Sequence, residues 1–291
     1  MTAAVMDLTA RAQQRRRLRR RFTRRPTAVI GLVGVAIFVV VALFGPLISP
    51  ADPNATNYNE IFVSPFSSGH LLGTDDLGRD VLSRLIVGTR ASMEAGVFAT
   101  LIAALVGVLL GLFAGYYRGW LDTVVMRLTD VLLSFPFVIL AVGLASILGP
   151  SLSNAILALA IASIPTFIRI TRAEVLGLRE QDYVQAAVVS GAAGRVIMFG
   201  HILRNCLAPL VVQGSVAIPG AIIGAAMLSF LGLGEQPPTA SWGTMLSESQ
   251  NYLSQASWFA VFPGLAIALA TLSFNMFGDG LRDVLDPRGS Q

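Results

Sequence analysis

The stretch Val131–Ile168 reads VLLSFPFVILAVGLASILGPSLSNAILALAIASIPTFI and holds 38 residues without one charged side chain. A helix needs roughly 20 apolar residues to cross the hydrocarbon core of a membrane. As one straight helix this stretch would be about 57 Å long, because each residue adds about 1.5 Å. The turn-forming run 149–154, which reads GPSLSN, divides it. The stretch therefore predicts two membrane-spanning helices joined by a short turn.

Further charge-free windows lie on both sides of this pair, and each is long enough for one spanning helix. Composition agrees, because 54% of the residues are hydrophobic, only 13% are charged and the mean hydropathy is +0.68. Gly107, Gly111 and Gly115 follow one another at a spacing of four residues, which lets a second helix approach closely. The sequence predicts an all-α polytopic membrane protein with six transmembrane helices. The four further windows are 29–48, 95–116, 205–234 and 249–278.

The arginines predict the orientation of the chain. If the N-terminus is cytoplasmic, 18 of the 21 arginines lie on the cytoplasmic side and only Arg79, Arg84 and Arg90 lie outside. Because cytoplasmic loops of membrane proteins are rich in basic residues, both termini are expected in the cytoplasm. The expected divisions are a basic cytoplasmic segment at 1–27 and a six-helix domain at 28–291, which contains an external loop at 49–92 and a cytoplasmic loop at 169–204.

The residue types that are missing limit the chemistry of this chain. It has no lysine, so it cannot supply the phosphate-binding lysine of a Walker A loop, and any ATP would have to be hydrolysed by another chain. Cys206 is its single cysteine, and His70 and His201 are its only histidines. The sequence also lacks a His-Glu-x-x-His zinc pattern and a Gly-x-Ser-x-Gly nucleophile elbow. We therefore expect no enzyme activity and no bound metal.

The external loop ends in the motif His70–Arg90, which reads HLLGTDDLGRDVLSRLIVGTR. Its apolar residues predict an amphipathic helix at the membrane surface. Thr74 is expected to cap the start of that helix, and Asp80 is expected to pair with Arg84 one turn later. The aspartates of the motif lack the spacing of a calcium-binding loop, so a metal site is not expected here.

A second segment that is not membrane-spanning lies between the fourth and fifth windows. The run QAA at 185–187, followed by Gly191, predicts a short helix that ends at a glycine cap. A helix–turn–helix outside the bilayer can occupy a groove of a partner protein, or it can be a loop that packs on its own chain; the residues leave both alternatives open. The residues expected to form the second apolar stripe are Val196, Phe199, Ile202 and Leu203, opposite Arg195 and Arg204.

Three motifs together resemble a known family. The pattern at 185–191, with His-Ile-Leu at 201–203, resembles the EAA loop of the permeases of bacterial ABC importers. The stretch His70–Arg84 looks like the second permease subunit of dipeptide and oligopeptide importers, and so does the tail at 278–288, which reads GDGLRDVLDPR.

The resemblance implies a type I ABC importer permease fold in the bacterial plasma membrane. It also implies several partners: a homologous permease that completes a heterodimer, two ATPase subunits that use ATP and Mg²⁺, and an extracytoplasmic substrate-binding protein. No cofactor would be bound by this chain. Gln185 departs from the family's Glu, and Arg204 departs from its Pro. The resemblance assigns ATPase coupling to Gln185, Ala186, Ala187, Gly191, Val196, Phe199, Ile202 and Leu203, and the external family motif to Gly73, Thr74, Asp75, Gly78, Arg79 and Asp80.

The leading hypothesis is a permease subunit that imports di- and oligopeptides and is coupled to ATPase subunits through the loop at 185–204. The motifs do not separate peptides from nickel chelates, haem or glutathione. A stand-alone secondary transporter or ion channel is an alternative, although the charge-free windows hold no residue that could carry a coupling ion. Polar residues in or near the last two windows are expected either to contact substrate or to bond between helices: Asn205, Gln213, Ser215, Ser229, Ser273 and Asn275.

Overall fold

The computed structural model describes residues 25–67 and 69–285. Within these residues the secondary structure is helical, and strand-like pairing is limited to two isolated bridges in the loop before α3. The main helices are α2 Pro26–Ile48, α3 Val81–Tyr117, α4 Gly119–Leu133, α5 Phe137–Leu148, α6 Leu152–Arg179, α7 Asp182–Val189, α8 Gly194–Val196, α9 Leu203–Phe230, α10 Trp242–Ser249 and α11 Ser257–Leu285. Short turns of helix complete the set: 3₁₀ turns η1 Tyr58–Glu60 and η3 Gln250–Tyr252, and a π-helical turn η2 Ile197–Ile202.

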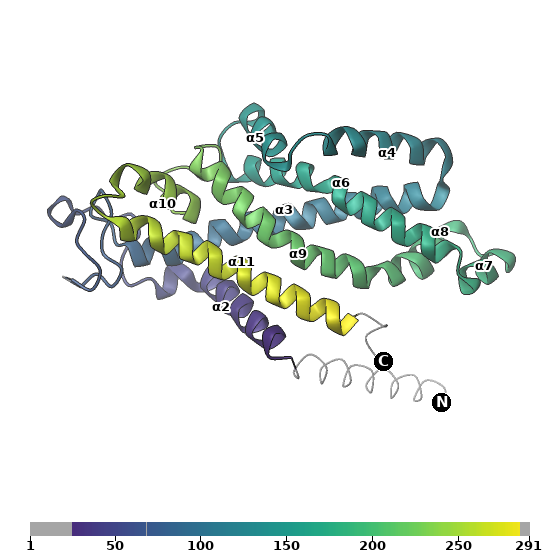
Figure 1. Cartoon of the computed structure of the whole chain (residues 1–291), viewed down its shortest axis with the longest axis horizontal. Coiled ribbons are helices and arrows are strands. Elements are labelled where there is room, and N and C mark those ends of the chain that lie inside the picture. Colours follow the sequence, from purple (N-terminus) through teal and green to yellow (C-terminus); the bar gives the residue numbers. More distant parts are fainter. Residues whose placement is uncertain (1–24, 68, 286–291) are drawn as a thin grey trace.

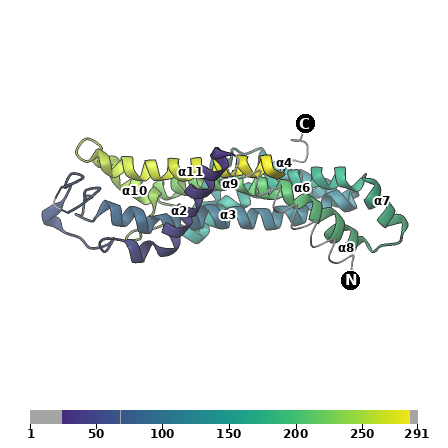
Figure 2. The ribbon, with the colours of Figure 1, turned by 90° about the horizontal axis from the view of Figure 1, so that it is seen from below.

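The bundle is long, and its two ends are built differently (Figure 1). The loop before α3 and helix α10 lie at one end, here called the α10 end, and α7 and α8 lie at the other, the α7 end; the side view in Figure 2 shows the same division. The Arg25 guanidinium forms an ion pair with Asp283, which joins the start of α2 to the last turns of α11. The basic segment expected at 1–27 lies almost wholly outside the described residues.

The helices confirm a polytopic all-helical membrane protein. Among the described residues, five helices are long and apolar enough to cross a membrane, and α4 with α5 makes a sixth span if the bent pair is counted as one. Large apolar side chains face outward, and Leu47, Leu105 and Leu269 are 82%, 66% and 55% exposed. Lipid tails would cover such a surface without loss, because they are as apolar as leucine.

The third predicted span is a broken one. Helices α4 and α5 meet at an angle of 93°, and α4 fills most of the stretch between the predicted spans at 95–116 and 131–148. Pro136 is the N-cap residue of α5, and a proline cannot donate the backbone hydrogen bond that would continue α4. The turn predicted between this span and α6 is confirmed, because α5 ends at Leu148 and Gly149 takes a φ of +89°.

The glycine stripe predicted in α3 faces α6. A Cβ atom added at Gly107 would lie 2.5 Å from the Cβ atom of Phe167, and one at Gly111 would lie 2.6 Å from the carbonyl oxygen of Ile168. Only glycine fits at such distances, so the two helices touch backbone to backbone. Small residues continue the core between α3, α5, α6 and α9: Ala95, Ala99, Ala145, Ala155, Ala158, Ala221 and Ala225.

Candidate functional site

The α7 end carries the segment that the sequence analysis singled out for partner binding. Helix α6 does not stop near residue 169, where the loop was expected, but continues to Arg179. The Arg179 guanidinium donates to the carbonyl oxygen of Tyr116 at 2.8 Å and lies over the ring of that tyrosine. The Gln185 side-chain amide in turn donates to the carbonyl oxygen of Arg179 at 2.8 Å. The neutral Gln185 therefore ties α7 to the end of α6.

The end of α7 has the predicted glycine cap. Gly191 takes a φ of +75°, which favours glycine. Its N–H donates to the carbonyl oxygen of Val188 at 3.0 Å, and the N–H of Ala192 donates to that of Ala187 at 3.1 Å. These two bonds are the pair that defines a Schellman motif. No atom of the described residues lies within 4 Å of a Cβ added at Gly191, so the turn is exposed on its outer side.

Helix α7 packs on one side only. Val184 is fully buried and Ala187 is half-buried against the start of α9. Other side chains of this helix are exposed: Val188 by 51%, Val189 by 87% and Tyr183 by 42%. We call the segment Asp182–Ile202 the elbow. Its outer surface carries exposed apolar side chains among polar ones, and no described residue covers them, so a partner protein could contact them.

The four residues predicted to form one apolar stripe after the turn do not share one face. Val196 and Phe199 are exposed, whereas Ile202 is fully buried and Leu203 is half-buried. The chain here is the π-helical turn η2, and each π turn takes more residues than an α-helical turn, which rotates the following side chains. The face that packs inward therefore consists of Ile197, Met198 and Ile202. Of the eight residues assigned to coupling, Gln185, Ala186, Gly191, Val196 and Phe199 are exposed on the elbow, and Ala187, Ile202 and Leu203 support it from within.

The external family motif forms a tight loop rather than a helix over its first half. Helix α3 begins at Val81, and its cap is Asp80, whose carboxylate accepts from the Ser83 N–H at 2.8 Å. Thr74 is not the cap; its Oγ1 accepts from the N–H of Val63 at 2.8 Å and holds the preceding loop. The predicted amphipathic helix is therefore the first part of α3 and not a separate element.

Glycines let this loop fold back on itself. Gly73 and Gly78 take φ values of +78° and +70°. A Cβ atom at Gly78 would lie 1.9 Å from the carbonyl oxygen of Asn57, so a side chain there cannot be placed without moving the backbone. All six motif residues are buried or half-buried at this one site.

The loop encloses a set of buried and half-buried charges, here called the ionic knot: Asp75, Asp76, Arg79, Arg84 and Glu248. Arg79 Nε donates to Asp75 at 2.6 Å. Arg79 and Arg84 each donate to the same oxygen of Glu248 at 2.9 Å. The expected pairing of Arg84 with Asp80 does not form, because Arg84 turns to Glu248 on α10. Glu248 was missed by the sequence analysis, since it lies 164 residues away and no local pattern links it to the motif.

The knot holds three carboxylates and two guanidiniums. Burial raises the pKa of Glu248, and it raises the pKa of Asp76, because the charged form loses solvation. Oxygens of Asp75, Asp76 and Glu248 lie within 4.8 Å of one another, a spacing that could suit a metal ion. Arg79 and Arg84 already place their positive charges among these oxygens, so the arrangement is explained by ion pairing.

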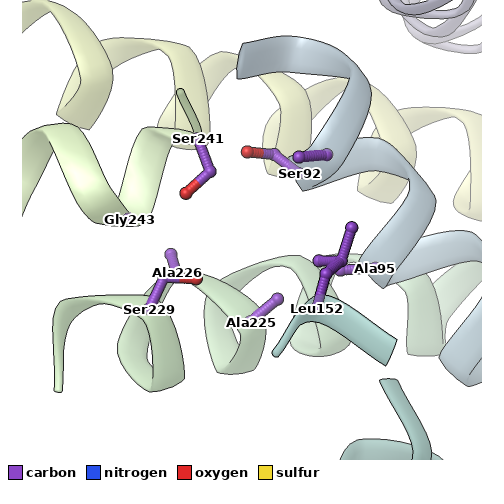
Figure 3. Close-up of a pocket in the computed structure, with 9 residues that line it drawn as sticks. Ser92, Ala95, Leu152, Ala225, Ala226, Ser229, Ser241 and Gly243 are labelled. Carbon is purple, nitrogen blue, oxygen red and sulfur yellow. The ribbon is translucent and has the colours of Figure 1, made fainter. Parts of the chain in front are cut away.

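Helix α10 is fixed to the bundle beside the knot. The Trp242 N–H donates to Ser92 Oγ at 3.1 Å, and Ser241 caps α10 by accepting from the Thr244 N–H at 3.1 Å. Figure 3 shows Ser92, Ser229 and Ser241 around a small cavity between α3, α9 and α10. Its volume of about 10 Å³ suits one water molecule.

The polar residues proposed in the last two windows have different roles. Asn205 bridges α9 to the elbow, because its amide donates to Tyr183 Oη at 3.1 Å. Ser215 and Ser273 donate to carbonyl oxygens of their own helices, at 2.7 Å each. Ser229 accepts from the N–H of Glu235 at 3.2 Å. Most of these groups are therefore satisfied locally rather than between spans.

Comparison with known proteins places these features in one family. A family model described as the inner membrane component of binding-protein-dependent transport systems matches residues 107–291. A second model, the N-terminal transmembrane domain of oligopeptide transport permease C, matches residues 13–65.

Relatives that match nearly the whole chain are also permease proteins of transport systems. The dipeptide transport system permease protein DppC of Escherichia coli K12 is 49% identical over 276 residues, which cover 93% of this chain and 92% of that protein. The protein of the same name from Haemophilus influenzae is 45% identical over 269 residues, covering 91% of each. The glutathione transport system permease protein GsiD of Pectobacterium atrosepticum is 44% identical over 270 residues, covering 92% of this chain and 89% of that protein.

Proposed function

Because this chain belongs to the family of inner membrane components of binding-protein-dependent transport systems, we propose that it is one permease subunit of an ATP-driven peptide importer. Its family and its long apolar helices make it a multi-pass protein of the bacterial plasma membrane. The observation that carries the choice of peptide is the 49% identity, over 93% of the chain, to a dipeptide transport permease.

The α7 end is proposed to face the cytoplasm. All of the arginines of the elbow and of the end of α6 gather there, and 18 of the 21 arginines lie inside in this orientation. The ionic knot and α10 then lie on the outer side, where a substrate-binding protein would deliver its cargo. The α7 end also presents exposed apolar side chains of α7, Val188 and Val189.

The elbow is proposed to be the contact with the ATPase subunits. A short helix that is exposed on one side and capped by a Schellman turn can enter a groove of another protein. The sequence has no lysine for nucleotide phosphates, so a separate subunit would supply that chemistry. Gln185 can donate hydrogen bonds but cannot form the charged pair that a glutamate would make.

The mechanism follows from how the elbow is joined to the spans. Closing of two ATPase subunits on ATP would draw together the elbows of this chain and of its homologous permease partner. The elbow is continuous with α9 through η2, and Arg179 and Gln185 join it to α6. A displacement of the elbow would therefore move α6 and α9 together and change access from the outer to the inner side.

The test uses Gly191→Asp in cells that lack the natural chain. The variant should lose ATPase co-purification and reduce uptake of labelled dipeptide at least tenfold. Gly149→Asp is the matched control, because Gly149 also has a positive φ, has no neighbour within 4 Å of a Cβ, and lies away from the elbow. Normal co-purification and uptake with Gly191→Asp would show that the elbow is not the coupling site.

Glutathione is the second candidate substrate, since a glutathione permease is 44% identical to this chain. Uptake of labelled dipeptide and of labelled glutathione by the same cells separates the two. Loss of glutathione uptake alone, when the chain is deleted, would replace peptide with glutathione as the main substrate.

A further inference from the structure

A groove that combines apolar walls with six polar side chains runs along α6, α9 and α11 and reaches Phe137 of α5, and α9 lies between α6 and α11 (Figure 1). Two hollows of about 310 and 510 Å³ open on this face, and Gln213 lines both. They therefore form one groove that passes Gln213. We call it the α9 groove; its polar lining consists of Ser163, Thr166, Glu174, Gln213, Asp279 and Arg282.

The position of Gln213 shows that lipid does not cover the groove. The residue lies about 15 Å from the start of α9 and about 26 Å from its end, given the rise of an α-helix. Its side chain is partly exposed and forms no hydrogen bond with another described residue. An amide in contact with acyl chains would have no partner, which is strongly unfavourable. This face of the helix must therefore meet water or another protein.

The wider hollow, near the α7 end, holds charges of both signs. Other charges of α6 are paired: Arg169 donates to Asp130 at 2.7 Å, and Arg172 donates to Asp122 at 2.7 Å. Glu174, Asp279 and Arg282, in contrast, form no ion pair within the described part of the chain, although all three line the same 510 Å³ hollow. This volume is within the range of about 300–1,000 Å³ that holds small ligands.

We propose that the α9 groove is this subunit's wall of the transport path, and that its mouth at the α7 end contacts both charged ends of a zwitterionic peptide. Arg282 would receive the terminal carboxylate, and Glu174 and Asp279 would receive the terminal ammonium group. Gln213 would exchange hydrogen bonds with the peptide backbone on the way. The inference rests on the proposed function and names the residues that substrate touches.

The first test measures whether water reaches the groove. Gln213→Cys and Thr166→Cys are prepared in the full complex in membrane vesicles and treated with a charged, membrane-impermeant thiosulfonate reagent. The natural Cys206 is fully buried and gives the background rate. Leu269→Cys is the control, because Leu269 is 55% exposed on α11 but lies outside the groove. The groove cysteines should react at least tenfold faster than the control.

Equal reaction rates at Gln213→Cys and Leu269→Cys would show that water does not reach the groove, and would overturn the proposal that it lines the transport path. This measurement needs no peptide, so its failure is distinct from failure of the proposed function. Slow labelling of the groove cysteines together with normal dipeptide uptake would reject only the groove as the transport path. Rapid labelling of these cysteines in a complex that imports no dipeptide would instead reject peptide as the substrate.

The second test concerns the charged mouth. Arg282→Gln should lower the maximal rate of dipeptide uptake about tenfold at a normal amount of complex, and Arg282→Lys should keep at least half of it because the charge remains. The half-saturating concentration should not change, since the binding protein determines it. Arg127→Gln, an exposed arginine on α4, is the control and should transport normally.

Normal transport by Arg282→Gln would overturn the assignment of the carboxylate contact, as would failure of the lysine variant to restore transport. Should Arg282→Gln not assemble, Glu174→Gln takes its place. That variant should lower maximal uptake severalfold, and a normal rate would reject the ammonium contact.

Discussion

At the α10 end, five charged groups pack against one another, three of them buried and two half-buried, whereas at the α7 end two neighbouring valines, Val188 and Val189, are exposed. The arrangement is the reverse of what solvent alone would favour. The ion pairs of this cluster join the loop, α3 and α10 to one another. The exposed valines of α7 belong instead to the surface that we propose contacts a partner protein. We call the α10 end closed because ion pairs join its loop, α3 and α10, and we call the α7 end open because α7 packs on one side only; apolar side chains such as Leu253 are exposed at the α10 end too.

The largest expected effect comes from removing one charge of the knot. Arg84→Met should lower the free energy of unfolding by about 3 to 5 kcal/mol, because a buried cation is lost and its carboxylate partners remain. Thermal unfolding of the purified chain in detergent measures this. Arg90→Met is the control, since the Arg90–Glu94 pair is exposed and its loss should not shift the melting temperature. If both variants melt alike, the α10 end is not closed by its charges.

Gly78→Ala should have the next largest effect. The new methyl group would meet the carbonyl oxygen of Asn57 at a positive φ, so the loop must shift, at a cost of about 2 to 3 kcal/mol. Gly69→Ala is the matched variant, because Gly69 also has a positive φ but no atom within 4 Å of an added Cβ. Gly69→Ala should cost only about 1 kcal/mol. Equal melting temperatures would show that the contact with Asn57 does not constrain the loop.

At the open end the expected effect is on binding and not on folding. Val189→Asp should leave the melting temperature unchanged, because the side chain is 87% exposed. It should lower the amount of ATPase that co-purifies at least tenfold, about 1.4 kcal/mol or more, since a charge would enter an apolar contact. Leu253→Asp makes the same change at an exposed leucine of the α10 end and should leave co-purification normal. Loss of co-purification with Leu253→Asp but not with Val189→Asp would place the ATPase contact at the α10 end instead.

The smallest effect is a pH dependence of the closed end. The hydrogen bond of His70 to Asp80, at 2.8 Å, raises the pKa of His70 above 6.5, and Glu60 adds to the rise. Stabilisation by the protonated ring is therefore complete below about pH 6.5 and is lost as the pH rises through the raised pKa. The raised pKa of Glu248 acts in the same direction at lower pH.

The melting temperature should accordingly fall between pH 6 and pH 8, and His70→Gln should flatten this part of the curve. A melting temperature that rises over this range in the natural chain would contradict the assignment of His70 as a stabilising cation.

Much of the membrane fold was predictable because its causes are local in the sequence. Charge-free windows require spanning helices, and the spacing of Gly107 and Gly111 requires a close neighbour. The glycine cap at Gly191 was also predictable, because a positive φ at a helix end is a property of three or four residues. The assignment of substrate-contacting and ATPase-contacting residues remains a prediction.

Other features depended on distant partners. Arg84 was expected to pair with Asp80 one turn away, but it pairs with Glu248, which only the packing of α10 brings within reach. The stripe through Val196 and Phe199 assumed an α-helical period, and the π turn at Ile197–Ile202 changed it. The bend between α4 and α5 was signalled by Pro136, but a proline inside an apolar window can also be tolerated in a continuous helix, as Pro165 is in α6.

The unbroken length of α3 has a consequence for distances. At 37 residues it measures about 56 Å, nearly twice the thickness of the hydrocarbon core. It must therefore project into water on at least one side, and the same rod touches the ionic knot and, through Phe113, the elbow. A tilt of about 5° about one end would sweep the far end through about 5 Å. A rigid helix of this length could therefore transmit a displacement at one face of the membrane to the other face without a flexible linker.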